Sequence, residues 1–196
     1  TLSEAGGFLK TDQSLDRPDI QHHFVIGLID DHLRKLHYGY GYSCHVCLLR
    51  PYSRGTVSLA SAKHDDAPLI NPNFLNDSRD LETLIKGAKM TQNILNTPPL
   101  KKYQKREIYG VDSNLTDKEW EQHIRNRADT IYHPVGTCKM GKDPLAVVNS
   151  SLKIRGLKNI RVADASIMPT ITSGNTNAPT IMIGEKCATM IMDVHE

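Results

Sequence analysis

The strongest candidate for a catalytic residue in this sequence is a histidine that stands between a tyrosine and a proline. It belongs to residues 132–141, where His133 is followed by Pro134 and then by glycine and other small residues. Proline restricts the preceding residue to extended backbone, so the ring of His133 has a defined direction. Histidine titrates near neutral pH and is the commonest general acid or base in enzymes. The segment therefore predicts an active-site turn with His133 as its base, the alternative being a buried, hydrogen-bonded structural histidine.

A second polar cluster lies about forty residues further along the chain, at residues 173–180. Its serine, glycine, asparagine and threonine residues are typical of a loop that runs into the start of a helix. We expect that helix from about residue 178 to residue 192, with Asn177 as its N-cap and Pro179 in its first turn. Such a helix start offers free backbone N–H groups and the positive end of the helix dipole. An electron-rich cofactor suits that position.

A carboxylate, Asp164, ends a predicted strand at residues 159–164, and an alternating segment at residues 151–157 predicts another strand before it. Ligands bind at the carboxyl ends of strands in open α/β sheets, so Asp164 is a candidate partner for a ligand hydroxyl or amide. An aspartate in this place is equally typical of a turn or cap carboxylate. The spacing supports both readings.

Two further helices are predicted to form the scaffold. The first begins after the capping cluster at residues 76–78 and ends at residues 97–99, where two prolines follow a threonine. Its apolar face has helical spacing and consists of Leu81, Leu84, Ile85, Ala88 and Leu95. The second begins at Thr116, with Glu119 three residues later as a capping box. Its inward face is formed by two residues one turn apart, Trp120 and Ile124.

Strand signals dominate the earlier part of the chain. An apolar run covers residues 20–29, and two strand-like runs at residues 45–50 and 55–60 are joined by a short polar segment, which predicts a β-hairpin in an antiparallel sheet. Residues 68–75 contain prolines that fit an edge strand or a loop better than a central strand. The predicted fold class is α+β, an antiparallel sheet with flanking helices.

Composition excludes several classes of protein. At 196 residues with 39% hydrophobic content, the chain can bury a core without a disulfide or a metal. Its 24 basic and 22 acidic residues nearly balance, which argues against a nucleic-acid partner and against a polybasic membrane patch. No apolar run approaches the roughly 20 residues of a membrane-spanning helix. We expect a cytoplasmic protein, with peripheral attachment of the full-length protein to the inner membrane as a second possibility.

The cysteines suggest a different kind of site. Cys44 and Cys47 are spaced C-x-x-C, and Cys138 and Cys187 could complete four thiolate ligands for zinc. The close pair lies in a β-rich run, where residues three apart point to opposite faces of a sheet. We therefore expect buried thiols and no metal site. The histidines without ligand spacing are expected to be hydrogen-bonded or solvated, namely His22, His23, His32 and His37.

The chain resembles the glucose-methanol-choline (GMC) flavoprotein oxidoreductase family, essentially over its whole length but only as that family's C-terminal portion. The motifs that carry the resemblance stand in the family's order and spacing, at residues 132–141, 161–169 and 174–180, and residues 45–57 support them. The likeness is greatest to alcohol and choline dehydrogenases.

The resemblance implies two parts with different roles. Residues 1–130 resemble the family's substrate domain, and residues 131–196 resemble the histidine turn with the closing strand and helix of its FAD-binding domain. The family's G-x-G-x-x-G fingerprint is missing, because the nearest string, at residues 39–44, has Cys44 where the third glycine should stand. The chain also begins at Thr1 and not at methionine. We expect a piece of a longer FAD enzyme that binds FAD weakly or not at all by itself.

The resemblance also implies roles for individual residues. His133 is the base or acid that acts on the substrate hydroxyl while hydride passes from the adjacent carbon to flavin N5. Asn175 is the second catalytic residue, because it stands 11 positions after Asp164 as in similar enzymes, which Asn177 does not. The implied cofactor-binding residues are Tyr132, Asp164, Ala165, Thr176, Asn177 and Ala178.

The implied reaction is oxidation of a primary alcohol to an aldehyde, with a quinone or similar compound as the final electron acceptor. Choline is the alternative substrate, although a quaternary ammonium group calls for an aromatic cage. A second alternative is a non-catalytic binding module that kept the fold and lost the cofactor half. A fragment of a larger enzyme is also expected to expose apolar surface and to self-associate.

Overall fold

The computed structural model describes residues 3–109 and 114–193. Its contacts divide the chain into two compact units, one built from Thr1–Ser53 with Leu75–Asp129 and the other from Arg54–Phe74 with Thr130–Glu196. The sequence analysis placed residues 54–74 with the first part. The division into a substrate domain and a closing piece of a cofactor domain stays a prediction about function.

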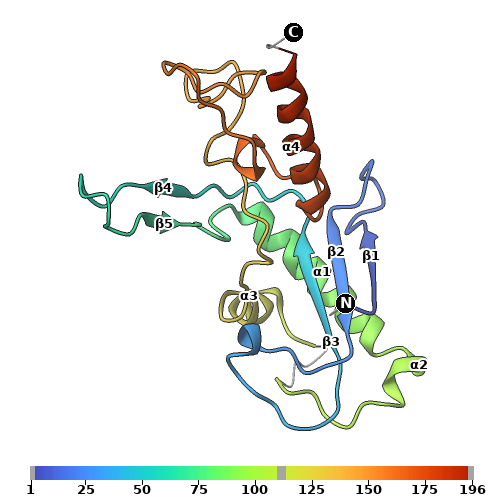
Figure 1. The fold of residues 1–196 in the computed structure, drawn as a ribbon. Coiled ribbons are helices and arrows are strands. Elements are labelled where there is room, and N and C mark those ends of the chain that lie inside the picture. Colours follow the sequence, from blue (N-terminus) through green and yellow to red (C-terminus); the bar gives the residue numbers. More distant parts are fainter. Residues whose placement is uncertain (1–2, 110–113, 194–196) are drawn as a thin grey trace. The chain divides into compact units, whose positions relative to one another are not determined.

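The first unit is built on a three-stranded antiparallel sheet, as the sequence predicts (Figure 1). Strand β2 (Ile20–Val25) is central, between β1 (Ala5–Leu9) and β3 (Ser43–Leu48). Ile20 pairs with residues on both neighbouring strands and is fully buried. A short 3₁₀ helix, η1 (Asp31–Leu33), lies between β2 and β3. Strand β1 was not predicted, because its AGGFL sequence has weak strand propensity.

One face of this sheet is covered by helix α1 (Ser78–Leu95), which contacts both β2 and β3 (Figure 1). Gly87 permits the close approach, since a Cβ there would lie 3.0 Å from a methyl group of Val46. The predicted start is confirmed by Asp77, whose side chain accepts a hydrogen bond from the backbone N–H of Arg79. The predicted apolar face is also confirmed, with Leu81 buried and the others half-buried.

The other helices of this unit are short. Helix α2 (Pro98–Lys101) begins at the prolines that end α1. Helix α3 (Asp117–Arg125) has the predicted capping box, in which the Thr116 hydroxyl and the Glu119 carboxylate each bond to the other's backbone N–H. Trp120 and Ile124 are buried as predicted. Both helices of the predicted scaffold are thus confirmed.

The predicted hairpin between residues 45–50 and 55–60 is wrong. Strand β4 (Thr56–Ser58) pairs with β5 (Leu69–Asn71) in a separate two-stranded sheet. The connecting residues Tyr52 and Ser53 donate their backbone N–H groups to the carboxylate of Asp80, at 2.7 and 2.8 Å. Since those groups bond to α1, the connection does not turn back on β3.

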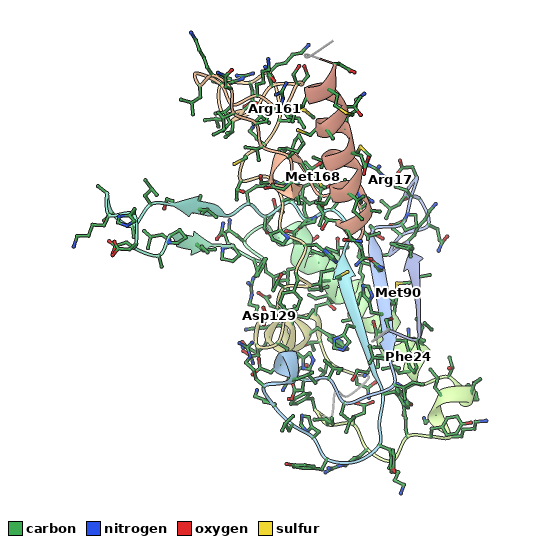
Figure 2. The ribbon with its side chains drawn as sticks, viewed as in Figure 1. Arg17, Phe24, Met90, Asp129, Arg161 and Met168 are labelled. Atoms are coloured by element: carbon green, nitrogen blue, oxygen red, sulfur yellow. The ribbon has the colours of Figure 1, made fainter. Side chains whose placement is uncertain are left out.

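The second unit buries its own core cluster. Helix α4 (Asn177–Met192) and the 3₁₀ helix η2 (Ala165–Ile167) pack together, and Figure 2 shows Met168 beside α4. The cluster consists of apolar residues that are more than nine-tenths buried, namely Val148, Leu152, Ile167, Met168, Ile183 and Cys187. This core holds together the segments that carry the sequence motifs.

The strands predicted at residues 151–157 and 159–164 are wrong as continuous elements. Within the described residues they form only isolated bridges, in which Val148 pairs with Ile154 and Lys153 pairs with Arg161. The backbone is interrupted by positive φ angles of 62° at Leu152, 78° at Gly156 and 60° at Asn159. Left-handed residues break the alternation on which a regular ladder depends.

Candidate active site

The site is centred on His133, whose ring nitrogens both have partners from the loop before α4. Asn175 Nδ2 lies 2.7 Å from His133 Nε2, and Thr176 Oγ1 lies 3.0 Å from His133 Nδ1. The ring is half-buried, Asn175 is exposed and Thr176 is only 6% exposed. The two predicted catalytic residues, 42 positions apart, are therefore in direct contact.

The orientation assigned to the Asn175 amide corresponds to one tautomer of the histidine. Asn175 Nδ2 can only donate, so His133 Nε2 accepts with its lone pair. A neutral imidazole then carries its proton on Nδ1, which donates to Thr176 Oγ1. The result is a ring with a basic nitrogen toward the exposed asparagine and a protonated nitrogen toward the buried threonine. A general base needs this arrangement.

The turn after His133 is held to η2 by backbone hydrogen bonds. The N–H of Cys138 donates to the carbonyl of Ser166 at 3.0 Å, and the N–H of Met140 donates to the carbonyl of Ile167 at 2.7 Å. Gly136 has φ of 91°, and a Cβ on it would lie 3.3 Å from the Met168 carbonyl oxygen. The glycine therefore permits both the turn and its close approach to η2.

Tyr132, directly before the histidine, has an uncommon backbone conformation. Its φ of 65° lies in the left-handed region, which costs a non-glycine residue about 1–3 kcal/mol. Its N–H donates to Thr130 Oγ1 at 3.0 Å, and its side chain is 64% exposed. Together with Pro134, this conformation directs His133 toward the loop before α4. Strained backbone of this kind is concentrated at functional sites.

The N-cap of α4 differs by one residue from the prediction. Thr176 is the N-cap and Asn177 is the first helical residue. Among the described residues, no side chain caps this helix start and no acidic residue stands in its first turn. Asn177 and Ala178 are exposed, so the first turn presents uncapped N–H groups and the positive end of the helix dipole. Such an environment favours a negatively charged group.

Asp164 and Ala165 lie at the start of η2 and not at the end of a strand. The Asp164 carboxylate accepts a hydrogen bond from the backbone N–H of Ser166 at 2.8 Å and is the N-cap of this short helix. Of its two readings, the cap carboxylate is therefore the one observed. Asp164 is exposed and Ala165 half-buried. Their contacts with a cofactor stay a prediction.

One contact of His133 was not predicted from the sequence. The resemblance assigns Thr176 to the cofactor, whereas its side chain bonds to His133. A partial signal existed, because a threonine stands three residues before Pro179, at a place typical of an N-cap. The sequence could not show that its hydroxyl would bond outside its own helix.

The prediction of buried thiols is only partly right, because Cys187 is buried whereas Cys44, Cys47 and Cys138 are half-buried. Burial raises the pKa of the Cys44 and Cys47 thiols to about 11, which keeps both protonated and poorly nucleophilic. Across residues 3–109 and 114–193, no group of three or more His, Cys, Asp or Glu side chains could hold a metal ion. The side chain of His32 lies outside those described. No helix in the same ranges is long and apolar enough to cross a membrane.

Curated alcohol and choline dehydrogenases match almost the whole chain. It is 51% identical over 191 residues to an alcohol dehydrogenase [acceptor] of Pseudomonas putida, covering 97% of this chain and 35% of that protein. It is 40% identical over 188 residues to an oxygen-dependent choline dehydrogenase of Citrobacter koseri, covering 96% and 34%. The chain thus spans about a third of the length of the curated relatives it matches.

A solved structure and a family model agree with these matches. A structure concerned with FAD modification in the formate oxidase of Aspergillus oryzae RIB40 superposes with a TM-score of 0.84 at 31% identity, covering 92% of this chain and 32% of that one. The family model described as GMC oxidoreductase matches residues 51–184, which include the histidine turn, η2 and the start of α4. The chain belongs to the GMC oxidoreductase family.

Proposed function

We propose that this chain carries the acid–base residues of an FAD-dependent alcohol dehydrogenase that oxidises a primary alcohol to an aldehyde. The observation that supports this most is the pair of contacts on His133, which leaves a lone pair on Nε2 beside the amide of Asn175. The similarity to an alcohol dehydrogenase at 51% identity supports the choice of substrate class.

The two residues have complementary roles toward an alcohol. Because Asn175 Nδ2 and His133 Nε2 are 2.7 Å apart, both reach a hydroxyl placed beside them. The hydroxyl donates to Nε2 while its oxygen accepts from Nδ2, and these bonds replace the one between the two side chains. His133 takes the hydroxyl proton as the alcohol carbon loses a hydride, which yields the aldehyde. General-base action of this kind contributes about 10²–10⁴-fold.

The residues that would hold the cofactor are those at the start of α4, Asn177 and Ala178, whose N–H groups and helix dipole favour negative charge. The flavin, when bound, supplies the hydride acceptor. Tyr132, Asp164 and Ala165 are proposed to complete the surface that faces it. The remaining part of the cofactor site, including the diphosphate cradle, is proposed to lie in a portion of the full-length protein that is outside these 196 residues.

Choline is the second candidate substrate, and the similarity to choline dehydrogenases at 40% identity favours it. A simple primary alcohol and choline share the reacting CH–OH group and differ in the quaternary ammonium. Comparing anaerobic flavin reduction by 1-butanol and by choline therefore separates them. We propose a quinone or similar compound as the acceptor of the electrons.

Replacing the base tests the proposed function. In the full-length protein with FAD bound, we expect His133→Ala to retain flavin and to lose reduction of that flavin by alcohol, because no group takes the hydroxyl proton. Stopped-flow absorbance under anaerobic conditions measures the reduction. His64→Ala, at an exposed histidine between β4 and β5, is the matched control.

Undiminished reduction in the His133→Ala protein would remove the histidine from the mechanism. Wild-type protein that binds no flavin and oxidises neither alcohol would support the non-catalytic binding module.

A further inference from the structure

The N-cap residue of α4 uses its hydroxyl outside its helix. A threonine at an N-cap ordinarily accepts a hydrogen bond from a backbone N–H two or three residues later. In the described part of the chain, Thr176 makes no such bond, and its Oγ1 lies 3.0 Å from His133 Nδ1 instead. The helix thus forgoes a cap that is typically worth about 1 kcal/mol. Stabilisation of α4 does not by itself explain why the Thr176 hydroxyl bonds to His133.

The backbone of Thr176 is fixed by the helix that follows. Its carbonyl oxygen accepts from the backbone N–H of Thr180 at 3.0 Å and from Thr180 Oγ1 at 2.6 Å. The Thr176 side chain is nearly completely buried, whereas the histidine and asparagine reach the surface. A hydroxyl on a β-branched side chain held in this way has little rotational freedom. It is a rigid acceptor for the ring proton.

We propose that Thr176 is a positioning residue for His133, and this inference rests on the function proposed above. Its hydroxyl oxygen accepts the Nδ1 proton and so keeps the lone pair on Nε2, toward Asn175 and the substrate. Once the ring has taken the hydroxyl proton at Nε2, the same oxygen still accepts from Nδ1–H of the imidazolium. Thr176 acts through the histidine and does not contact the alcohol.

Without this acceptor, only the Asn175 amide, whose Nδ2 donates to Nε2, favours the proton on Nδ1. The other tautomer places the proton on Nε2, where it can donate to the asparagine once the amide turns its oxygen toward the ring. A ring protonated on Nε2 cannot accept the hydroxyl proton at that atom. The hydroxyl of Thr176, accepting from Nδ1 while the Asn175 amide donates to Nε2, therefore stabilises the reactive tautomer together with Asn175.

The test uses the full-length flavoprotein and three variants. Thr176→Val removes the hydroxyl and keeps the branched shape, Thr176→Ser keeps the hydroxyl, and Thr180→Val removes a neighbouring hydroxyl that bonds only to the Thr176 carbonyl among the hydrogen bonds described. We expect Thr176→Val to slow flavin reduction at saturating alcohol about ten- to a hundredfold, by analogy with metal-ligating histidines that lose their hydrogen-bond partner. We expect KM to stay unchanged, and Thr176→Ser and Thr180→Val to react at rates close to wild type.

The tautomer itself is measured by ¹⁵N NMR of histidine-labelled protein, with His133 assigned by its absence from the His133→Ala spectrum. We expect protonated Nδ1 in wild type and in Thr176→Ser, and protonated Nε2 in Thr176→Val. A wild-type ring protonated on Nε2 overturns the inference without any Thr176 variant, so the test does not depend on Thr176→Val folding.

Two further outcomes overturn it. One is flavin reduction at the wild-type rate in Thr176→Val. The other is equally slow flavin reduction in Thr176→Val and Thr180→Val with the tautomer unchanged, which shows a purely structural role. The proposed function fails separately, if His133→Ala is still reduced by alcohol.

Discussion

Two histidines of this chain show how neighbours decide what a residue does. His133 is half-buried and has a donor on one ring nitrogen and an acceptor on the other. His22 is buried in the first unit, with Nε2 2.8 Å from Thr91 Oγ1. The Thr91 hydroxyl donates to the carbonyl of Gly87, so His22 Nε2 is the donor. Within the described residues, His22 Nδ1 has no hydrogen-bond partner. The same side chain is thus a candidate base in one place and a core residue in the other.

The buried histidine predicts a dependence of stability on pH. Burial lowers the pKa of His22 from its ordinary value of 6.5; the backbone of Gly87 partly opposes this shift, and the neighbouring His23 adds slightly to it. Below pH 6.5 the unfolded chain therefore binds more protons at this residue than the folded chain, and stability falls as the pH drops toward the folded pKa. We expect His22→Gln to lose less stability than wild type between pH 7.5 and pH 5.0, approximate test values chosen to span that window. Urea unfolding followed by circular dichroism measures this.

The exposed His64 offers the control, because His64→Gln should follow wild type at both pH values. An equal loss of stability in wild type and His22→Gln would contradict the prediction.

Among the elements, the connection between β3 and β4 shows what local sequence leaves undecided. The buried carboxylate of Asp80 accepts three hydrogen bonds, from the N–H groups of Tyr52 and Ser53 and from the Ser53 hydroxyl. An ionised carboxylate only accepts hydrogen bonds, so the two oxygens of Asp80 suit these three donors. This network ties the end of β3 to the start of α1.

Replacing Asp80 by Asn is expected to destabilise the first unit by about 1–3 kcal/mol, because an amide NH₂ then faces a backbone N–H in a buried site. The free energy of unfolding from urea titration measures the change. Asp16→Asn, at a side chain that is 87% exposed, is the matched control. Equal stability of the two variants would show that the network contributes little.

The elements predicted correctly are those with local causes. Helices α1 and α3 follow from apolar spacing and from the caps at Asp77 and Thr116. The partner of β4 was missed because strand pairing depends on contacts distant in sequence. The strands predicted before η2 were wrong because the left-handed backbone at residues such as Leu152 has no local signal in the sequence. At the site, motif recognition brought His133 and Asn175 together, whereas the Thr176 side-chain contact required coordinates.

At the scale of the whole molecule, the chain exposes large apolar side chains on elements of its second unit. On α4, Ile181, Met182 and Met192 are 59%, 58% and 62% exposed, and on β5 Ile70 is 66% exposed. Apolar surface of this kind favours contact with another protein surface. The curated relatives are about three times as long as the chain, so each contains a further portion that offers such a surface.

FAD binding by the 196-residue chain can be tested directly. The chain lacks the G-x-G-x-x-G sequence that holds a dinucleotide diphosphate. We therefore expect titration with FAD, followed by flavin fluorescence, to show weak binding or none, while the full-length protein binds FAD tightly. A stoichiometric yellow complex of the short chain would refute this expectation.

The contact between the Thr176 hydroxyl and His133 also limits how the thermal stability of this protein can be raised. Serine, asparagine and aspartate cap helices better than threonine does, so selection for thermal stability alone would favour Thr176→Asp at the start of α4. That change would strengthen the helix and place a carboxylate where negative charge on a cofactor is otherwise welcome. Under the role proposed for Thr176, stability and turnover compete for one side chain, and a stabilising substitution in this protein should be sought elsewhere in the helix.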